Sequence, residues 1–144
     1  MFQLSLMHKY PHVFFVQKLL KKWRHEMASV EAKNFSSDAD EVMTPNNARV
    51  ETVNVMGQRV MRLTVQPGWQ WSKDIKPLVG TDSCQAKHVG VIIEGTIKCV
   101  HDDGSEITYS AGDAYAIAPG HDAWVVGDSQ AVAFEFHGAW GENH

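Results

Sequence analysis

The sequence predicts one all-β domain, a β-sandwich or barrel, over about residues 45–138. Short segments in which apolar and polar residues alternate indicate half-buried strands, and no helical segment is expected between them. Turn signals separate these segments at regular intervals. The alternating residues are Val53 and Val55; Met61, Leu63 and Val65; Ile107 and Tyr109; Tyr115 and Ile117; Phe134 and Phe136. The turns fall at Met56-Gly57, Pro67-Gly68, Glu94-Gly95, Asp102-Asp103-Gly104, Ala111-Gly112 and Gly127-Asp128.

Residues 1–26 form a basic leader that differs from the rest of the chain. Apolar residues recur there at helical spacing beside lysines, which predicts a short N-terminal helix. These are Val16, Leu19, Leu20, Trp23 and Met27, beside Lys18, Lys21 and Lys22. One interpretation is a helix that docks on a membrane surface or a partner. The other, which we favour, is upstream sequence read through, with the functional protein starting at Met27.

An N-terminal arm over residues 27–44 joins the leader to the predicted barrel. The run from Ser36 to Glu41 places hydroxyls before acidic groups, which is typical of the capped start of a single helical turn. Thr44-Pro45 ends that turn. Residues 139–144 are expected to form a C-terminal tail.

Composition narrows the classes of function. The chain has 144 residues, 44% hydrophobic and 21% charged, which suits one globular domain. It contains no apolar run of the ~18 residues that a membrane span needs, so no integral membrane association is expected. Its two cysteines make no disulfide framework and favour a reducing, cytoplasmic location.

The net charge of −4 is unevenly distributed. Residues 1–26 hold five basic residues and one acidic residue, a balance of +4, whereas the remainder holds eight basic and sixteen acidic residues, a balance of −8. The chain after residue 26 is acidic enough to repel phosphate backbones, so we expect no nucleic-acid partner.

The stretch before Gly95 resembles the first motif of the cupin superfamily. That motif runs Gly, five or more residues, His-x-His, three or four residues, Glu, six residues, Gly. Counting back from Gly95 places His88 where the family has its glutamate. Cys84 and Asp82 then stand at the two positions of the His-x-His pair. The glycine of Pro67-Gly68 matches the leading glycine, although the stretch that follows it is longer than usual.

The second cupin motif has its counterpart from Gly112 onward. The spacing fits through Pro119 and Gly120, but the histidine position is Ala123, and His121 lies two residues early. The resemblance covers about residues 60–137. It implies a jelly-roll barrel, also called a double-stranded β-helix, and a homodimer. It also implies a divalent metal, commonly iron, zinc, nickel or manganese, held inside the barrel.

A non-standard metal site is one hypothesis for this chain. Asp82, Cys84 and His88 have the even spacing that places residues on one face of a regular strand, and His121 could supply a fourth ligand. Carboxylate, thiolate and imidazole together suit zinc or ferrous iron. The alternatives are structural: Cys84 as a small buried apolar side chain, His88 as a hydrogen-bonded interior histidine, Asp82 as a loop cap and His121 in an exposed loop.

Tryptophans define the other candidate site. Trp69, Trp71 and Trp124 are expected around the barrel mouth, either packed in the core or lining a pocket for a flat or sugar-like ligand. We therefore predict a binding module in which His88 and His121 help the tryptophans to hold a small polar ligand. The alternative is a metal-dependent enzyme of dioxygenase, isomerase or hydrolase type, with its catalytic residues unassigned.

Overall fold

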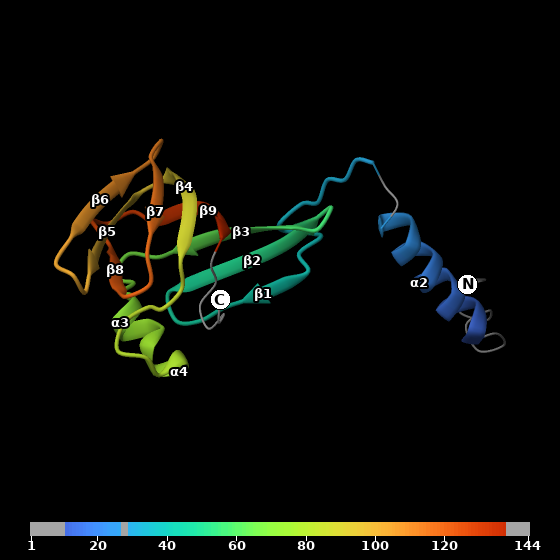
Figure 1. Cartoon of the computed structure of the whole chain (residues 1–144), viewed down its shortest axis with the longest axis horizontal. Coiled ribbons are helices and arrows are strands. Elements are labelled where there is room, and N and C mark those ends of the chain that lie inside the picture. Colours follow the sequence, from blue (N-terminus) through green and yellow to red (C-terminus); the bar gives the residue numbers. More distant parts are fainter. Residues whose placement is uncertain (1–10, 27–28, 138–144) are drawn as a thin grey trace. The chain divides into compact units, whose positions relative to one another are not determined.

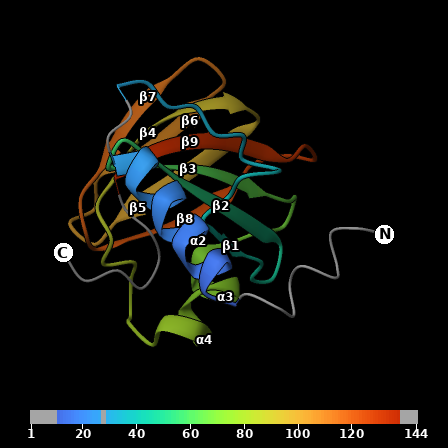
Figure 2. The same cartoon turned by 90° about the vertical axis from the view of Figure 1, so that its right-hand side faces the viewer.

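The computed structural model describes residues 11–26 and 29–137, and it divides the chain into two units, Met1–Ala32 and Lys33–His144. The first unit contains helix α2 (Pro11–Glu26), which confirms the predicted N-terminal helix (Figure 2). Its apolar side chains Phe15, Leu20 and Trp23 are exposed. Within the described residues, no helix combines the length and the apolar character needed to cross a membrane. The predicted start at Met27 and the tail at 139–144 lie outside the described residues.

The second unit is an antiparallel β-barrel made of two sheets (Figure 1). Six strands form one sheet in the order β1-β2-β3-β9-β4-β7, and three form the other in the order β6-β5-β8. The bounds are β1 (Glu41–Met43), β2 (Ala48–Val55), β3 (Gln58–Val65), β4 (His88–Glu94), β5 (Thr96–His101), β6 (Glu106–Ser110), β7 (Ala114–Ile117), β8 (His121–Val125) and β9 (Ala131–His137). The end strands are β1 and β7 in the first sheet and β6 and β8 in the second.

Two single-turn helices, α3 (Trp71–Asp74) and α4 (Lys76–Val79), lie between β3 and β4, where no helix was predicted. They form because Trp71 and Ile75, four residues apart, are both buried. Asp74 accepts a hydrogen bond from the backbone N–H of Gln70 at 3.0 Å, which holds the first turn. Gly80 ends the second at a φ of 76°, a left-handed conformation that favours glycine.

The turn predicted in the N-terminal arm lies two residues earlier than expected. The backbone N–H of Asp38 donates to the carbonyl oxygen of Asn34 at 2.8 Å, and Asn34 Oδ1 accepts from the N–H of Ser36 at 2.8 Å. The capping group is therefore Asn34, because its Oδ1 also accepts from the backbone N–H of Ser37 at 3.3 Å. Residues 41–43 form strand β1, so the sheet begins before residue 45.

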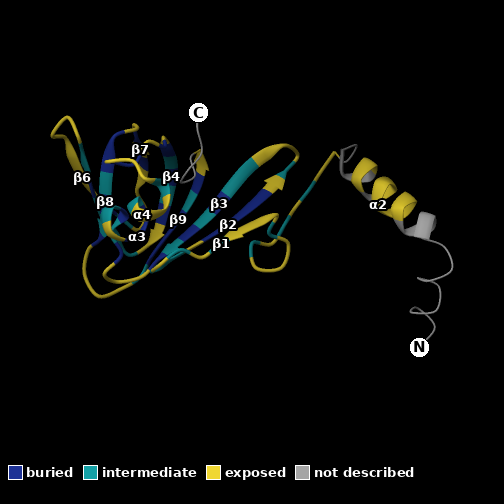
Figure 3. Cartoon of the chain, turned by 90° about the horizontal axis from the view of Figure 1, so that it is seen from below, coloured by how far each residue is buried: buried dark blue, intermediate teal, exposed yellow. Residues whose placement is uncertain are grey.

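The core lies between the two sheets, and the buried residues, dark blue in Figure 3, follow the strands. Met61, Leu63 and Val65 of β3 all face inward, as their alternation predicted. In strand β9 the residues that face the core are not Phe134 and Phe136, as their alternation predicted, but the residues that alternate with them. Glu135 is buried, whereas Phe136 is 48% exposed and Phe134 stacks on Phe35 with ring centroids 5.3 Å apart.

Candidate metal centre

Three buried side chains converge inside the barrel: Cys84, His88 and His121. Their ligand atoms all lie within 4.8 Å of one another. Cys84 Sγ lies 3.6 Å from His88 Nε2, and the two imidazole rings meet edge to face with centroids 5.2 Å apart. This is the only group of three or more His, Cys, Asp or Glu side chains within metal-binding reach among the described residues.

Backbone pairing brings these residues together from different parts of the chain. The N–H of Cys84 donates to the carbonyl oxygen of His121 at 2.7 Å, and the N–H of Gly120 donates back to the carbonyl oxygen of Cys84 at 2.7 Å. His88 opens β4 opposite Ile117 of β7. His121 and Ala123 share the inner face of β8 because alternate residues of a strand point the same way.

Each histidine uses Nδ1 for a hydrogen bond directed away from the cluster. His88 Nδ1–H donates to Glu135 Oε2 at 2.8 Å, and His121 Nδ1–H donates to the carbonyl oxygen of Ala118 at 2.8 Å. Tyr115 O–H donates to Glu135 Oε1 at 2.6 Å, so both carboxylate oxygens are engaged. A carbonyl and a carboxylate accept only, which assigns the protons to Nδ1 and leaves each Nε2 as the ligating atom.

The electrostatics of the group favour a thiolate. Burial raises the pKa of Cys84, but the hydrogen bonds with His121 and His88 outweigh it and lower that pKa to about 6. Burial lowers the pKa of His88, but Glu135 and Cys84 raise it to about 10. In the absence of a metal, the His88 Nε2 proton therefore occupies the place between imidazole and sulfur that a divalent cation would take.

The donor set fits a zinc or ferrous ion. One thiolate and two imidazoles are the ligands that these metals prefer, whereas magnesium and calcium require oxygen ligands. Three protein ligands leave a coordination position for water or substrate. The carboxylate behind His88 and the backbone carbonyl behind His121 are the outer partners typical of metal-bound histidines.

A small inner cavity of about 30 Å³ adjoins His88 and His121. This volume holds one or two water-sized groups. The cavity is also walled by the buried indoles of Trp69 and Trp71, and Trp71 Nε1–H has no hydrogen-bond partner in the described part of the chain. The remaining wall consists of Leu63, Ile97, Tyr109, Ile117, Ala123 and Glu135.

Two of the predicted site residues lie away from this group. The side chain of Asp82 is fully exposed and lies 3.6 Å from Lys76 Nζ, because the chain becomes a regular strand only at His88. Trp124 is half-buried, and the alternating burial along β8 places it on the face opposite His121.

Sequence reasoning did not identify Glu135 and Tyr115, which complete the surroundings of His88. The available signal was Glu135 itself, because it is a single carboxylate within the apolar segment of residues 131–136. An acidic residue in a strand otherwise rich in buried side chains indicates a buried partner.

Comparisons with known proteins agree on the fold. No family model and no curated protein matches the chain. A Cupin 2 conserved barrel domain protein from Salinispora arenicola superposes with a TM-score of 0.52 at 18% identity, covering 75% of this chain and 87% of that chain. An RmlC-like cupin family protein with a double-stranded β-helix fold from Methanocaldococcus jannaschii gives a TM-score of 0.50 at 14% identity, over 79% and 94%.

A Rhizobium leguminosarum protein of unknown function gives a TM-score of 0.53 at 14% identity, over 75% of this chain and 96% of that chain. The double-stranded β-helix predicted from the two glycine motifs is thereby confirmed.

Proposed function

We propose that this chain, which has the cupin fold, holds a divalent metal ion on Cys84 Sγ and on Nε2 of His88 and His121. The observation that carries the proposal is the orientation of the two imidazoles. Both donate Nδ1–H to acceptors behind them, so both Nε2 atoms and Cys84 Sγ face one buried point, where a bound cation would displace the His88 Nε2 proton.

We further propose that the inner cavity admits one small polar group, either water or the oxygen-bearing end of a substrate. A volume of about 30 Å³ excludes a sugar or an aromatic ring. Trp71 Nε1–H is a buried donor, so an oxygen acceptor beside it would relieve the cost of leaving it unpaired. In this proposal the tryptophans wall the metal centre and exclude bulk water, rather than stacking on a ligand.

The chemistry that such an ion supplies is Lewis-acid polarisation of an oxygen ligand. The protein's own groups would orient the ion and its ligand: Glu135 fixes the ring of His88, and the unpartnered Trp71 Nε1–H would donate a hydrogen bond to the ligand oxygen. This arrangement supports a metal-dependent enzyme. A metal-free binding module is the second candidate, because Trp71 would offer the same donor to an oxygen ligand without an ion.

Cobalt substitution of untagged full-length protein tests the proposal. We expect one equivalent of Co²⁺ and the near-ultraviolet charge-transfer absorption of a cobalt–thiolate bond. That absorption should disappear in Cys84→Ser and persist in Cys99→Ser, which removes a buried thiol outside the cluster. His88→Ala and His121→Ala should each lose the metal, and His137→Ala should keep it. Failure to bind any first-row divalent metal would leave the binding module.

Two expectations remain predictions: the homodimer implied by the resemblance and the cytoplasmic location inferred from cysteine usage. Light scattering on the purified full-length protein measures the oligomeric state directly, and a mass of one chain at micromolar concentration would contradict the homodimer.

A further inference from the structure

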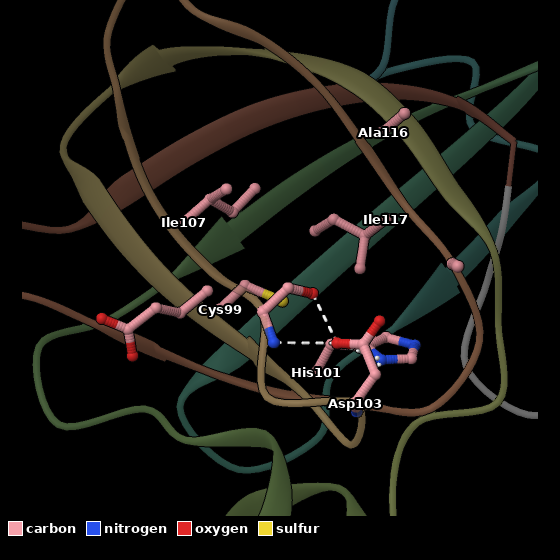
Figure 4. Close-up of a pocket in the computed structure, with 9 residues that line it drawn as sticks. Cys99, His101, Asp103, Ile107, Ala116 and Ile117 are labelled. Carbon is pink, nitrogen blue, oxygen red and sulfur yellow. Dashed lines mark hydrogen bonds and ion pairs between the residues drawn. The ribbon is translucent and has the colours of Figure 1, made fainter.

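A second cavity of the barrel, with a volume of about 170 Å³, is lined by none of the proposed metal ligands (Figure 4). Its acidic groups are already paired: Asp103 Oδ1 lies 3.1 Å from His101 Nδ1, and Glu106 Oε1 lies 3.3 Å from Lys98 Nζ. No unpaired charge therefore remains among the described residues that line it. Helix α2 differs, because its described basic and apolar side chains are both exposed.

Apolar side chains form a stripe along α2. Residues three or four positions apart lie on the same side of a helix, because each residue turns it by about 100°. This spacing joins Phe15, Val16, Leu19, Leu20 and Trp23 into one continuous surface. Their exposed fractions run from 39% at Leu19 to 68% at Phe15, and the described part of α2 is coloured as exposed in Figure 3. The stripe is therefore apolar area that a partner would remove from water.

Basic residues lie beside that stripe. Lys18 and Lys22, one helical turn apart, are exposed, and neither has an ion-pair partner within the described part of the chain. The α2 sequence holds four basic residues and one acidic residue, a balance of +3. Lysines next to an apolar stripe are typical of a helix that lies on a membrane surface. The partner that covers α2 must therefore offer negative charge and apolar area together.

We infer that α2 docks on a lipid bilayer with anionic headgroups, with its stripe among the upper acyl chains and its lysines at the phosphates. Such a bilayer supplies negative charge and hydrocarbon side by side. A nucleic acid would pair with the lysines and leave the stripe in water. Phe15 and Trp23, at the two ends of the stripe, add aromatic rings that suit the boundary between headgroups and acyl chains. The leader is then a docking segment of the functional protein rather than upstream sequence read through.

The bound helix lies in the plane of the membrane. Its 16 residues span about 24 Å, which is shorter than the ~30 Å hydrocarbon core, and its lysines oppose a spanning orientation. The chain after residue 26 carries a balance of −8, so an anionic surface repels it. Membrane affinity therefore depends on the leader, and exposed residues of the barrel unit supply the controls.

Sedimentation with vesicles tests the docking. Untagged full-length protein is mixed with phosphatidylcholine vesicles that contain about 30% phosphatidylserine, or with phosphatidylcholine vesicles alone, in about 0.1 M salt. We expect binding to the anionic vesicles to be at least about tenfold tighter, and to weaken as added salt screens the lysines. The emission of Trp23 should shift to shorter wavelength on binding, because its indole leaves water. Trp23→Phe should remove that shift while sedimentation persists.

Matched variants separate the contribution of charge from that of the apolar stripe. Lys18→Gln should weaken binding to anionic vesicles about fivefold, which corresponds to about 1 kcal/mol, and adding Lys22→Gln should bring the loss to about 30-fold. Lys87→Gln removes the same charge from an exposed position of the barrel unit and should change the affinity less than about twofold. Leu20→Gln should weaken binding about tenfold, whereas Leu78→Gln, at the 70% exposed leucine of α4, should leave it unchanged.

Equal sedimentation with both kinds of vesicle, no sedimentation with either, or equal losses in the α2 and barrel variants would each overturn the inference. Near-ultraviolet circular dichroism of every variant should match that of the unmodified protein, so that a loss of binding is not a loss of fold. Each sedimentation is run with chelator and again with added Zn²⁺. Because α2 contains none of the proposed metal ligands, binding should be the same in both, and the membrane and metal proposals succeed or fail separately.

Discussion

Replacing Glu135 tests whether its carboxylate organises the centre of the barrel. The side chain is buried and accepts from His88 Nδ1–H at 2.8 Å and from Tyr115 O–H at 2.6 Å. Glu135→Ala leaves two buried donors without an acceptor. Glu135→Gln keeps the shape and one acceptor oxygen, and it removes the charge.

The expected magnitudes follow from those contacts. Each stranded buried donor costs about 1–3 kcal/mol, so Glu135→Ala should lower the free energy of unfolding by about 4 kcal/mol. Glu135→Gln should cost about 1–2 kcal/mol, because its amide can still accept from His88 and donate to the Tyr115 oxygen. For metal, the loss of a carboxylate behind a ligating histidine weakens binding by about 10–100-fold.

Two measurements separate the effects. Urea denaturation of metal-free protein gives the free energy of unfolding, and competition with a chromophoric chelator gives the Zn²⁺ affinity. Gln66→Ala, an exposed polar residue that follows β3, is the control for both. Loss of less than about 1 kcal/mol in Glu135→Ala would mean that the two donors find other partners. An unchanged Zn²⁺ affinity in Glu135→Gln would show that the carboxylate does not orient a metal-bound His88.

Three further predictions concern the barrel and the leader. Gly90→Ala should lower the free energy of unfolding in urea by at least about 2 kcal/mol, because a Cβ there would overlap the carbonyl oxygen of Phe134. An unchanged free energy of unfolding would contradict the close packing of β4 on β9. Burial raises the pKa of Glu51, but hydrogen bonds from Arg62 and Arg49 outweigh it, so the net pKa is lowered. Its stabilisation is therefore present above the ordinary pKa near 4.5 and is lost as pH falls through the lower folded-state value, so Glu51→Gln should flatten the acid limb of a stability–pH curve. A chain starting at Met27 should melt within about 2 °C of the full chain, because both sheets lie in the unit Lys33–His144; a drop of more than about 5 °C would show that the leader stabilises the barrel.

The fold was predictable because its signals are local. Gly95, Gly112 and Gly120 all adopt positive φ, which glycine reaches without strain, so their spacing directly encodes the turns of the barrel. The short helices α3 and α4 were not predictable from periodicity, since each is a single turn. Their formation depends on burial of Trp71 and Ile75, a tertiary effect.

The candidate site was less predictable, because the direction of a side chain depends on neighbouring strands. The even spacing of Asp82 and Cys84 implies a shared face only in a regular strand, and here Cys84 makes one isolated bridge before β4 begins. Glu135 points inward because it lies on the same face of β9 as Ala131 and Ala133, and it pairs with the inward-facing Met61 of β3. The alternation of Phe134 and Phe136 in the sequence indicated the opposite face, because phenylalanine is more often buried than glutamate.

His121 lies two residues before the histidine position of the cupin motif that the sequence resembles, and this displacement still directs it into the barrel. Two residues along a strand preserve the face and move the side chain by about 7 Å, so His121 points inward like Ala123. The move carries the imidazole to the end of β8 where Cys84 pairs with it. A displacement of one residue would have turned the side chain outward, as it does for Asp122, whose carboxylate accepts from the backbone N–H of Ser72 at 3.0 Å. Cys84 and His121 therefore occupy bridged backbone positions, which brings the thiol and the imidazole within 4.8 Å of each other.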